Sequence, residues 1–190
     1  MKMHTLGRTG ISVSRICLGT MTFGHQNTEA EGHQQMDMAA EHGVNFFDSA
    51  EMYPFPANPK TYGRTDEIVG TWLAARGQRD KIVVATKIAG PGARFEHIRG
   101  GSLKFDRTHL IQAVDDSLAR LRTDYIDLYQ THWPERPANY FGKLGYNHDA
   151  NAEWTPFEEM LDVMAEIEKA GKVRAFGISN ETPWGLMELM

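Results

Sequence analysis

The chain has 190 residues, of which 41% are apolar and 24% charged, a composition typical of a folded globular protein rather than a disordered or fibrous one. Its 20 Lys and Arg against 25 Asp and Glu leave a net charge of −5, so neither nucleic acid nor a membrane surface is expected as a partner. The single cysteine, Cys17, excludes an intramolecular disulfide, and the N-terminus has no apolar signal segment; both favour a cytoplasmic location.

The first residues predict a small hairpin that precedes the main fold. Residues 3–6 and 11–14 form two short segments, and the turn-forming tetrapeptide Gly7-Arg8-Thr9-Gly10 separates them. We expect this hairpin to plug the end of the main sheet that lies opposite the carboxyl ends of its strands.

Five short apolar segments are expected to form the strands of that sheet. They are residues 15–18, 44–47, 82–86, 125–130 and 173–178. Their near-continuous runs of Val, Ile and Phe, without polar alternation, are typical of strands covered on both faces.

Segments with a helical period of 3.6 residues follow these strands. Their expected starts are marked by helix-capping residues: Thr28 with Glu31, Asp106, Thr155 with Pro156 and Glu158, and Thr182 with Pro183. Strands and helices that alternate in this way predict right-handed parallel βαβ units, and therefore an α/β fold.

The connections between these elements are unequal in length. Every helix-to-strand link is short, whereas three strand-to-helix links are long: residues 54–62, 89–105 and 133–154. In a parallel sheet those long links emerge at the carboxyl ends of the strands, which is where (β/α) barrels and doubly wound sheets carry their active sites. The longest link contains four aromatic residues, which either line a substrate pocket or pack the loop against the rim: Trp133, Tyr140, Phe141 and Tyr146.

Ionisable residues end three consecutive strands, at Asp48, Lys87 and His132, and Tyr53 follows Asp48 by five residues. Because carboxyl ends of parallel strands meet at one face, these four side chains are expected to converge there. Any one of them alone would more often be a buried, structurally paired polar residue. Four on one face favour a catalytic site.

No set of His, Cys and carboxylates in the sequence has zinc-like spacing, so we expect no metal.

The four side chains suggest a specific chemistry. Lys87 and Asp48 offset each other's desolvation, and we expect the Lys87 charge to lower the pKa of Tyr53 from about 10 by about 1–3 units. Tyr53 would then serve as a proton donor, while a neutral His132 donates a hydrogen bond to the same substrate oxygen. An acid acting on a carbonyl oxygen without a metal or nucleophile fits hydride transfer to the carbonyl carbon from a nicotinamide cofactor.

Four motifs in series closely resemble the signature of the aldo/keto reductase superfamily. They are residues 43–53 (GVNFFDSAEMY), 85–87 (ATK), 128–132 (LYQTH) and 171–180 (GKVRAFGISN). The resemblance covers the chain from about Met3 to Met190, and residues 51–54 and 132–146 look most like the bacterial Tas-type branch of that family.

The resemblance implies an NADP(H)-dependent (β/α)8 TIM barrel that reduces aldehydes and ketones to alcohols. It implies that Asp48, Tyr53, Lys87 and His132 form a catalytic tetrad with Tyr53 as the general acid. The residues that it places at the cofactor are Thr20, Met21, Asp48, Ser179 and Asn180. Many relatives carry Trp where this chain has Met21, so the substrate pocket there is expected to differ in shape.

The length fits only part of such a barrel. Five strand–helix units fill 190 residues, whereas eight units of this size need more than the roughly 250 residues typical of the fold. We therefore interpret residues 1–190 as the N-terminal portion of a single barrel domain, whose remaining strands and phosphate-binding loops would follow residue 190. The open edges of such a partial barrel would permit self-association.

Two other hypotheses remain. The chain could be a truncated, non-catalytic fragment or interaction module that lacks the adenosine-phosphate site. A doubly wound binding domain is disfavoured, because no glycine-rich phosphate turn follows the first strand of the sheet.

Overall fold

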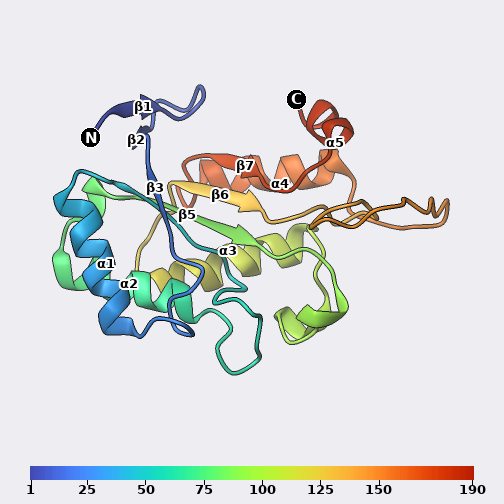
Figure 1. Ribbon diagram of the computed structural model, residues 1–190. Coiled ribbons are helices and arrows are strands. Elements are labelled where there is room, and N and C mark those ends of the chain that lie inside the picture. The colour runs from blue at the N-terminus through green and yellow to red at the C-terminus, as the bar shows by residue number, and fades with distance from the viewer.

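The computed structural model describes residues 1–190 except for the side chain of Ala93. Two strands, β1 (Met3–Thr5) and β2 (Ser12–Ser14), form an antiparallel hairpin. A five-stranded parallel sheet follows, in which neighbouring strands are consecutive along the chain (Figure 1). Its strands are β3 (Cys17–Gly19), β4 (Phe46–Asp48), β5 (Val83–Ile88), β6 (Leu128–Thr131) and β7 (Phe176–Ile178). The predicted hairpin and parallel α/β fold are confirmed.

Each strand of the parallel sheet is followed by an α-helix. The helices are α1 (Glu29–Glu41), α2 (Arg64–Arg76), α3 (Arg107–Leu121), α4 (Phe157–Lys169) and α5 (Pro183–Glu188). Three short 3-10 helices lie in the connections: η1 (Arg79–Lys81), η2 (Ala93–Phe95) and η3 (Arg99–Gly101). Helix α2 packs against α1 and α3, and α3 packs against α4, so helices α1 to α4 follow one another in chain order beside the sheet (Figure 1).

Most helices begin where their capping residues predict. The Thr28 hydroxyl accepts a hydrogen bond from the Glu31 amide, the Asp106 carboxylate caps α3, and the Thr182 hydroxyl caps α5. The prediction for the fourth helix was wrong. Pro156 is its N-cap, and no side chain caps it. The Thr155 amide, which the predicted capping box would pair with Glu158, donates instead to the Glu135 carboxylate at 3.0 Å.

Four of the five strands are shorter than predicted, and the change is largest at β6 and β7. β6 begins at Leu128 and β7 at Phe176, and before them the pairing reduces to an isolated bridge between Ile126 and Val173. Between β5 and β6 the Asp127 carboxylate accepts the Val84 amide at 3.0 Å, and it also binds arginine side chains. A side chain therefore replaces part of the backbone ladder at this end of the sheet.

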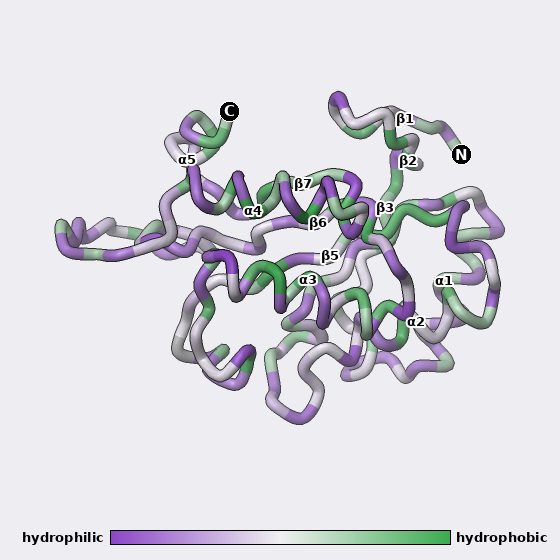
Figure 2. The backbone as a smooth tube through the Cα atoms, turned by 180° about the vertical axis from the view of Figure 1, so that it is seen from behind, coloured by the Kyte–Doolittle hydropathy of each residue, from purple (hydrophilic) through white to green (hydrophobic). Residues whose placement is uncertain are grey.

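The two faces of the sheet are buried differently. In β5, Val84, Thr86 and Ile88 lie on the face toward the helices, where a large apolar core forms. Along α4, hydrophobic residues recur with the helical turn and supply part of that core (Figure 2). On the other face, Val83 and Ala85 form a smaller cluster with Ile11 and Val13 of the hairpin, among others. The hairpin thus covers the amino ends of the strands, opposite their carboxyl ends.

Helices α2 and α3 approach closely at Gly70. A Cβ atom there would lie 2.3 Å from the Arg120 carbonyl oxygen and under 3 Å from the Leu121 backbone. Gly70→Ala is therefore expected to force the helices apart and to lower the free energy of unfolding by about 2–3 kcal/mol. Urea denaturation measures this. Gly19→Ala is the control, because nothing lies within 4 Å of its Cβ, and an unchanged midpoint for Gly70→Ala would contradict the packing described.

None of the helices in the described part of the chain has the length and apolar character needed to cross a membrane.

Candidate functional site

The predicted site residues lie at the carboxyl ends of the parallel strands, on the face of the sheet away from the helices. The register pairs Asp48 with Ala85 and Lys87 with Gln130. Since alternate residues of a strand share a face, the side chains of Asp48, Lys87 and Gln130 project to the same side. Tyr53 joins them from the turn that follows β4, and His132 from the residue that follows β6.

Lys87 and Asp48 form an ion pair at the centre of this group. The Lys87 Nζ lies 2.5 Å from Asp48 Oδ2 and donates to the Ser49 carbonyl oxygen at 2.7 Å, and the lysine side chain is only 7% exposed. Gln130 Nε2 donates to the second carboxylate oxygen of Asp48 at 3.3 Å. The Lys87 charge is therefore neutralised within the site rather than by solvent.

Tyr53 and His132 lie against each other above this ion pair. The Tyr53 hydroxyl and His132 Nε2 are 3.5 Å apart, and the two rings pack edge to face with centroids 5.4 Å apart. The Lys87 Nζ lies 5.3 Å from the centre of the Tyr53 ring. The four side chains expected to converge do converge.

The expectation that Lys87 lowers the pKa of Tyr53 was wrong. Burial, and after it the nearby Asp48 carboxylate, together raise the pKa of Tyr53 to about 12. The reason is geometric: the Lys87 ammonium is bound by Asp48 and Ser49, so its positive charge is offset by the carboxylate. In the protein alone, Tyr53 is a neutral phenol at physiological pH.

Titration of Tyr53 checks this directly. Because its folded pKa lies above its ordinary value of 10, folding favours the neutral phenol, and this contribution to stability is lost only as the pH rises from 10 toward 12. The difference in phenolate absorbance between the wild type and Tyr53→Phe is expected to stay flat up to pH 10. A one-tyrosine step with a midpoint near about pH 8 would show instead that Lys87 dominates.

His132 is neutral, as expected. Burial and then the Lys87 charge lower its pKa to about 3. Its Nδ1 is buried and makes no hydrogen bond to any described residue, so Nε2 is the ring nitrogen turned toward Tyr53.

The residues predicted to contact a cofactor lie around this group. Asn180 Nδ2 donates to the His132 carbonyl oxygen at 2.9 Å and to the Ser179 hydroxyl at 3.1 Å, which holds both residues beside His132. The buried Thr20 hydroxyl donates to the Asp48 carbonyl oxygen at 2.8 Å. Met21 is 43% exposed, and its carbonyl oxygen accepts the Phe55 amide at 3.0 Å. Thr20 thus lies against the backbone of Asp48, and Ser179 and Asn180 lie beside His132, while contact of the five residues with a cofactor stays a prediction.

Sequence reasoning missed Gln130 and Glu51 as members of the site. Gln130 holds Asp48, and its signal is its position two residues before His132, which places it on the same face of the strand. The Glu51 carboxylate is buried at the back of the turn that carries Tyr53. No sequence pattern reveals that role, because its partner Arg99 lies 48 residues away.

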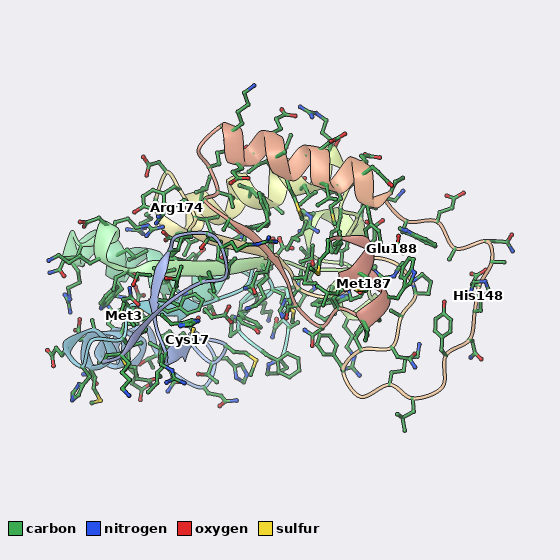
Figure 3. All side chains as sticks on the ribbon, turned by 90° about the horizontal axis from the view of Figure 1, so that it is seen from above. Met3, Cys17, His148, Arg174, Met187 and Glu188 are labelled. Atoms are coloured by element: carbon green, nitrogen blue, oxygen red, sulfur yellow. The ribbon has the colours of Figure 1, made fainter. Side chains whose placement is uncertain are left out.

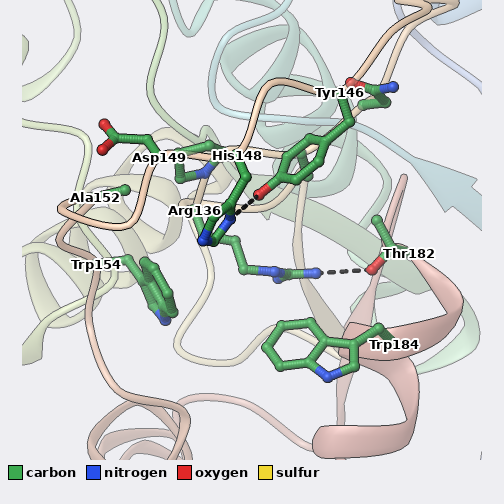
Figure 4. Close-up of a pocket in the computed structure, with 11 residues that line it drawn as sticks. Arg136, Tyr146, His148, Asp149, Ala152, Trp154, Thr182 and Trp184 are labelled. Atoms are coloured by element: carbon green, nitrogen blue, oxygen red, sulfur yellow. Dashed lines mark hydrogen bonds between the residues drawn. The ribbon is translucent and has the colours of Figure 1, made fainter.

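A separate hollow lies outside this group. It has a volume of about 590 Å³ between the loop that follows β6 and the start of α5, and Tyr146, Trp154 and Trp184 contribute to its walls (Figure 4). At its base the Arg136 guanidinium is paired with Glu181 and donates to the Thr182 hydroxyl at 2.9 Å. None of the four converging residues lines this hollow.

The aromatic residues of that loop lie in two different places. Trp133 is buried and packs against Phe95, Tyr140 and Phe141. Tyr146 instead lines the hollow and lies beside His148, in the part of the loop that extends away from the sheet (Figure 3).

No group of three or more His, Cys, Asp or Glu side chains in the described structure is placed to hold a metal ion.

Comparison with known sequences identifies the family. A model of the aldo/keto reductase family matches residues 15–190. The chain is 46% identical over 190 residues to Protein tas of Escherichia coli (strain K12), covering 100% of this chain and 55% of that protein. It is 38% identical over 193 residues to the uncharacterized oxidoreductase YrpG of Bacillus subtilis (strain 168), covering 99% and 52% respectively.

Solved structures agree with the sequence comparisons. Aldo-keto reductase AKR11C1 from Bacillus halodurans (holo form) superposes with a TM-score of 0.73 at 28% identity, covering 99% of this chain and 53% of that one. A thermostable aldo-keto reductase in complex with the inhibitor epalrestat gives a TM-score of 0.74 at 26% identity, covering 100% and 57%.

The chain spans about half the length of the curated relatives that it matches, which agrees with the prediction of an N-terminal part of a TIM-barrel-type fold. With a family model matched over nearly all of its residues and a strand order that follows the same architecture, this chain belongs to the aldo/keto reductase family.

Proposed function

We propose that the chain is the N-terminal portion, residues 1–190, of a single barrel domain of an NADP(H)-dependent oxidoreductase that reduces small aldehydes and ketones to alcohols. The observation that carries the proposal is the convergence of Tyr53, His132 and the Lys87–Asp48 ion pair at the carboxyl ends of the strands. Membership of the aldo/keto reductase family supports it. Composition and the single cysteine favour a cytoplasmic location.

In this proposal Tyr53 donates a proton to the carbonyl oxygen of the substrate. Its raised pKa keeps the phenol protonated across the physiological pH range, so the proton to be donated is present throughout that range. Neutral His132 offers Nε2 to the same oxygen and fixes its position near the phenol. The Lys87–Asp48 pair packs beside the phenol, with Lys87 Nζ 5.3 Å from the centre of the Tyr53 ring, and so helps to fix where the acid lies.

The chain's own residues fit the nicotinamide end of such a cofactor. Ser179 and Asn180 present a hydroxyl and an amide beside His132, which suit the carboxamide of a nicotinamide. Thr20, buried behind Asp48, and the exposed Met21 follow β3, beside the end of β4 that carries Asp48. When bound, a nicotinamide supplies the hydride for the carbonyl carbon. The preference for NADP(H) rests on the family resemblance alone.

A second candidate is a non-catalytic fragment or interaction module. It is favoured by the coverage of only 55% of Protein tas, and by the open edges of β3 and β7, each of which pairs with one strand in the parallel sheet. Such edges would permit self-association.

Binding separates these two candidates. Saturable NADPH binding by the chain in a fluorescence titration, weakened by Asn180→Ala, would support the enzyme proposal and rule out the module. Absence of binding by a folded chain would support the module instead.

A further inference from the structure

A buried ion pair lies directly behind the turn that carries Tyr53. The Glu51 and Arg99 side chains are 0% and 1% exposed, and their charged groups are in contact. Glu51 belongs to the turn that follows β4, whereas Arg99 opens η3 in the long loop after β5. The pair therefore joins two loops at the carboxyl ends of neighbouring strands.

The pair fixes the turn to the end of β5 by several bonds. The Glu51 amide donates to the Lys87 carbonyl oxygen at 3.1 Å, and the Glu51 Oε1 accepts the Ala89 amide. Arg99 binds both groups: its Nη1 contacts the Glu51 carboxylate, and its Nη2 donates to the Ala89 carbonyl oxygen at 3.2 Å. Lys87 thus lies within the same short segment that Glu51 and Arg99 hold.

Tyr53 is two residues from Glu51 in this turn. Its amide donates to the Ala50 carbonyl oxygen at 3.0 Å, which closes the turn around Glu51. Any movement of the Glu51 side chain away from Ala89 therefore moves the turn that sets the position of the Tyr53 phenol relative to Lys87 and His132.

Stability alone is a weak reason for this arrangement. Burying two charges costs more than their attraction returns unless every polar atom is satisfied, and apolar residues often replace such pairs without loss. Here Glu51 Oε2 and Arg99 Nε are both buried, and neither has a hydrogen-bond partner among the described residues. The planar guanidinium of Arg99 instead bridges the Glu51 carboxylate and the Ala89 carbonyl oxygen, and this rigid bridge fixes the two segments relative to each other.

We infer that the Glu51–Arg99 pair is a positioning device that holds the Tyr53 phenol against His132 and Lys87. Its catalytic consequence rests on the function proposed above. In that reaction the pair acts through Tyr53 and touches neither substrate nor cofactor.

The positioning is measurable without activity, through the ring current of Tyr53 on His132. The two rings lie edge to face, so the NMR signal of the His132 ring reports the position of the Tyr53 ring. The test variant is the double substitution Glu51→Gln with Arg99→Met, which removes both charges and leaves no unpaired ion in the core. It is made in the wild type and in a Tyr53→Leu background, as a double-mutant cycle.

The expected result is a shift of the His132 signal by the double substitution when Tyr53 is present, and none when residue 53 carries Leu. An unmoved signal would overturn the inference. An equal shift in both backgrounds would do so too, because it would trace the effect to repacking of Trp133, whose ring lies 4.9 Å from that of His132. If the double variant does not fold, Arg99→Lys replaces it in the double-mutant cycle with Tyr53→Leu. This substitution keeps the positive charge but loses the planar guanidinium that reaches two acceptors.

A matched control comes from the other end of the strands. Arg79 binds the buried Asp127 at 2.7 Å, and Asp127 keeps Arg174 as a second partner when Arg79 is replaced. Arg79→Met therefore loses a buried arginine–carboxylate contact far from the turn. It is expected to leave the His132 signal unchanged, and a shift as large as that of the Glu51/Arg99 variant would contradict the inference.

The kinetic readout separates this inference from the proposed function. For carbonyl reduction, the Glu51/Arg99 variant is expected to lower kcat about 10- to 100-fold with little change in KM, and to have no further effect once Tyr53 is Phe. An unchanged kcat in that variant, while Tyr53→Phe is inactive, would overturn the inference alone. Absence of reductase activity, together with the Tyr53-dependent shift of the His132 signal, would overturn the proposed function alone.

Discussion

Replacing Tyr53 with phenylalanine is expected to lower the rate of carbonyl reduction by about 10²- to 10⁴-fold, the range that one positioned proton donor contributes. The substitution removes only the hydroxyl, so the edge-to-face contact with the His132 ring is kept. The hydroxyl is 3.5 Å from His132 Nε2, at the limit of a hydrogen bond, and little stability depends on it. The free energy of unfolding is therefore expected to change by less than about 1 kcal/mol.

Tyr140→Phe is the matched control for that prediction. Tyr140 is also half-buried in the long loops above the sheet, and its hydroxyl makes only a 3.5 Å contact with the Pro91 carbonyl oxygen. It is expected to retain wild-type kcat. Equal activity of Tyr53→Phe and Tyr140→Phe would remove Tyr53 from the proposed role.

The second large effect is an asymmetry within the Lys87–Asp48 pair. Asp48→Asn leaves a lysine ammonium that is 7% exposed with neutral acceptors and no negative charge beside it, so we expect it to lower the free energy of unfolding by about 3 kcal/mol. Lys87→Met leaves a carboxylate that is 29% exposed and still bound by Gln130. Because water reaches that carboxylate, a smaller loss of about 1–2 kcal/mol is expected.

Urea denaturation of both variants and of their combination measures this asymmetry. The combined variant removes both charges, so it is expected to be more stable than Asp48→Asn alone. Equal losses from the two single substitutions would show that solvent reaches Lys87 as freely as Asp48. All three variants are expected to lose most of the carbonyl reductase activity, whatever their stability.

Much of the site follows from local sequence rules. The strand ends at Asp48, Lys87 and His132 are visible as the points where apolar runs stop, and the parallel topology alone brings them to one face. Tyr53 could be placed because it lies only five residues beyond Asp48. These predictions depend on strand direction and spacing, which the alternation of strands and helices specifies strongly.

The errors concern interactions between distant segments. The pKa of Tyr53 depends on which atoms Lys87 binds, and the offsetting of its charge by Asp48 cannot be read from spacing. The predicted start of α4 was wrong because the Thr155 amide donates to Glu135, which lies 20 residues earlier in the chain. Glu51 was invisible for the same reason, since nothing near it in the sequence indicates that Arg99 is its partner.

The most direct test of the central claim is transfer of deuterium from NADPH labelled at C4 of the nicotinamide to a small aldehyde, with the complete barrel domain that contains residues 1–190 and its Tyr53→Phe variant compared. Both C4 epimers of the labelled NADPH are used. The account predicts label at the carbinol carbon of the alcohol product with the wild type, and a rate lower by about 10²-fold or more with Tyr53→Phe. NADPH binding without label transfer, or equal transfer by the two proteins, would contradict it.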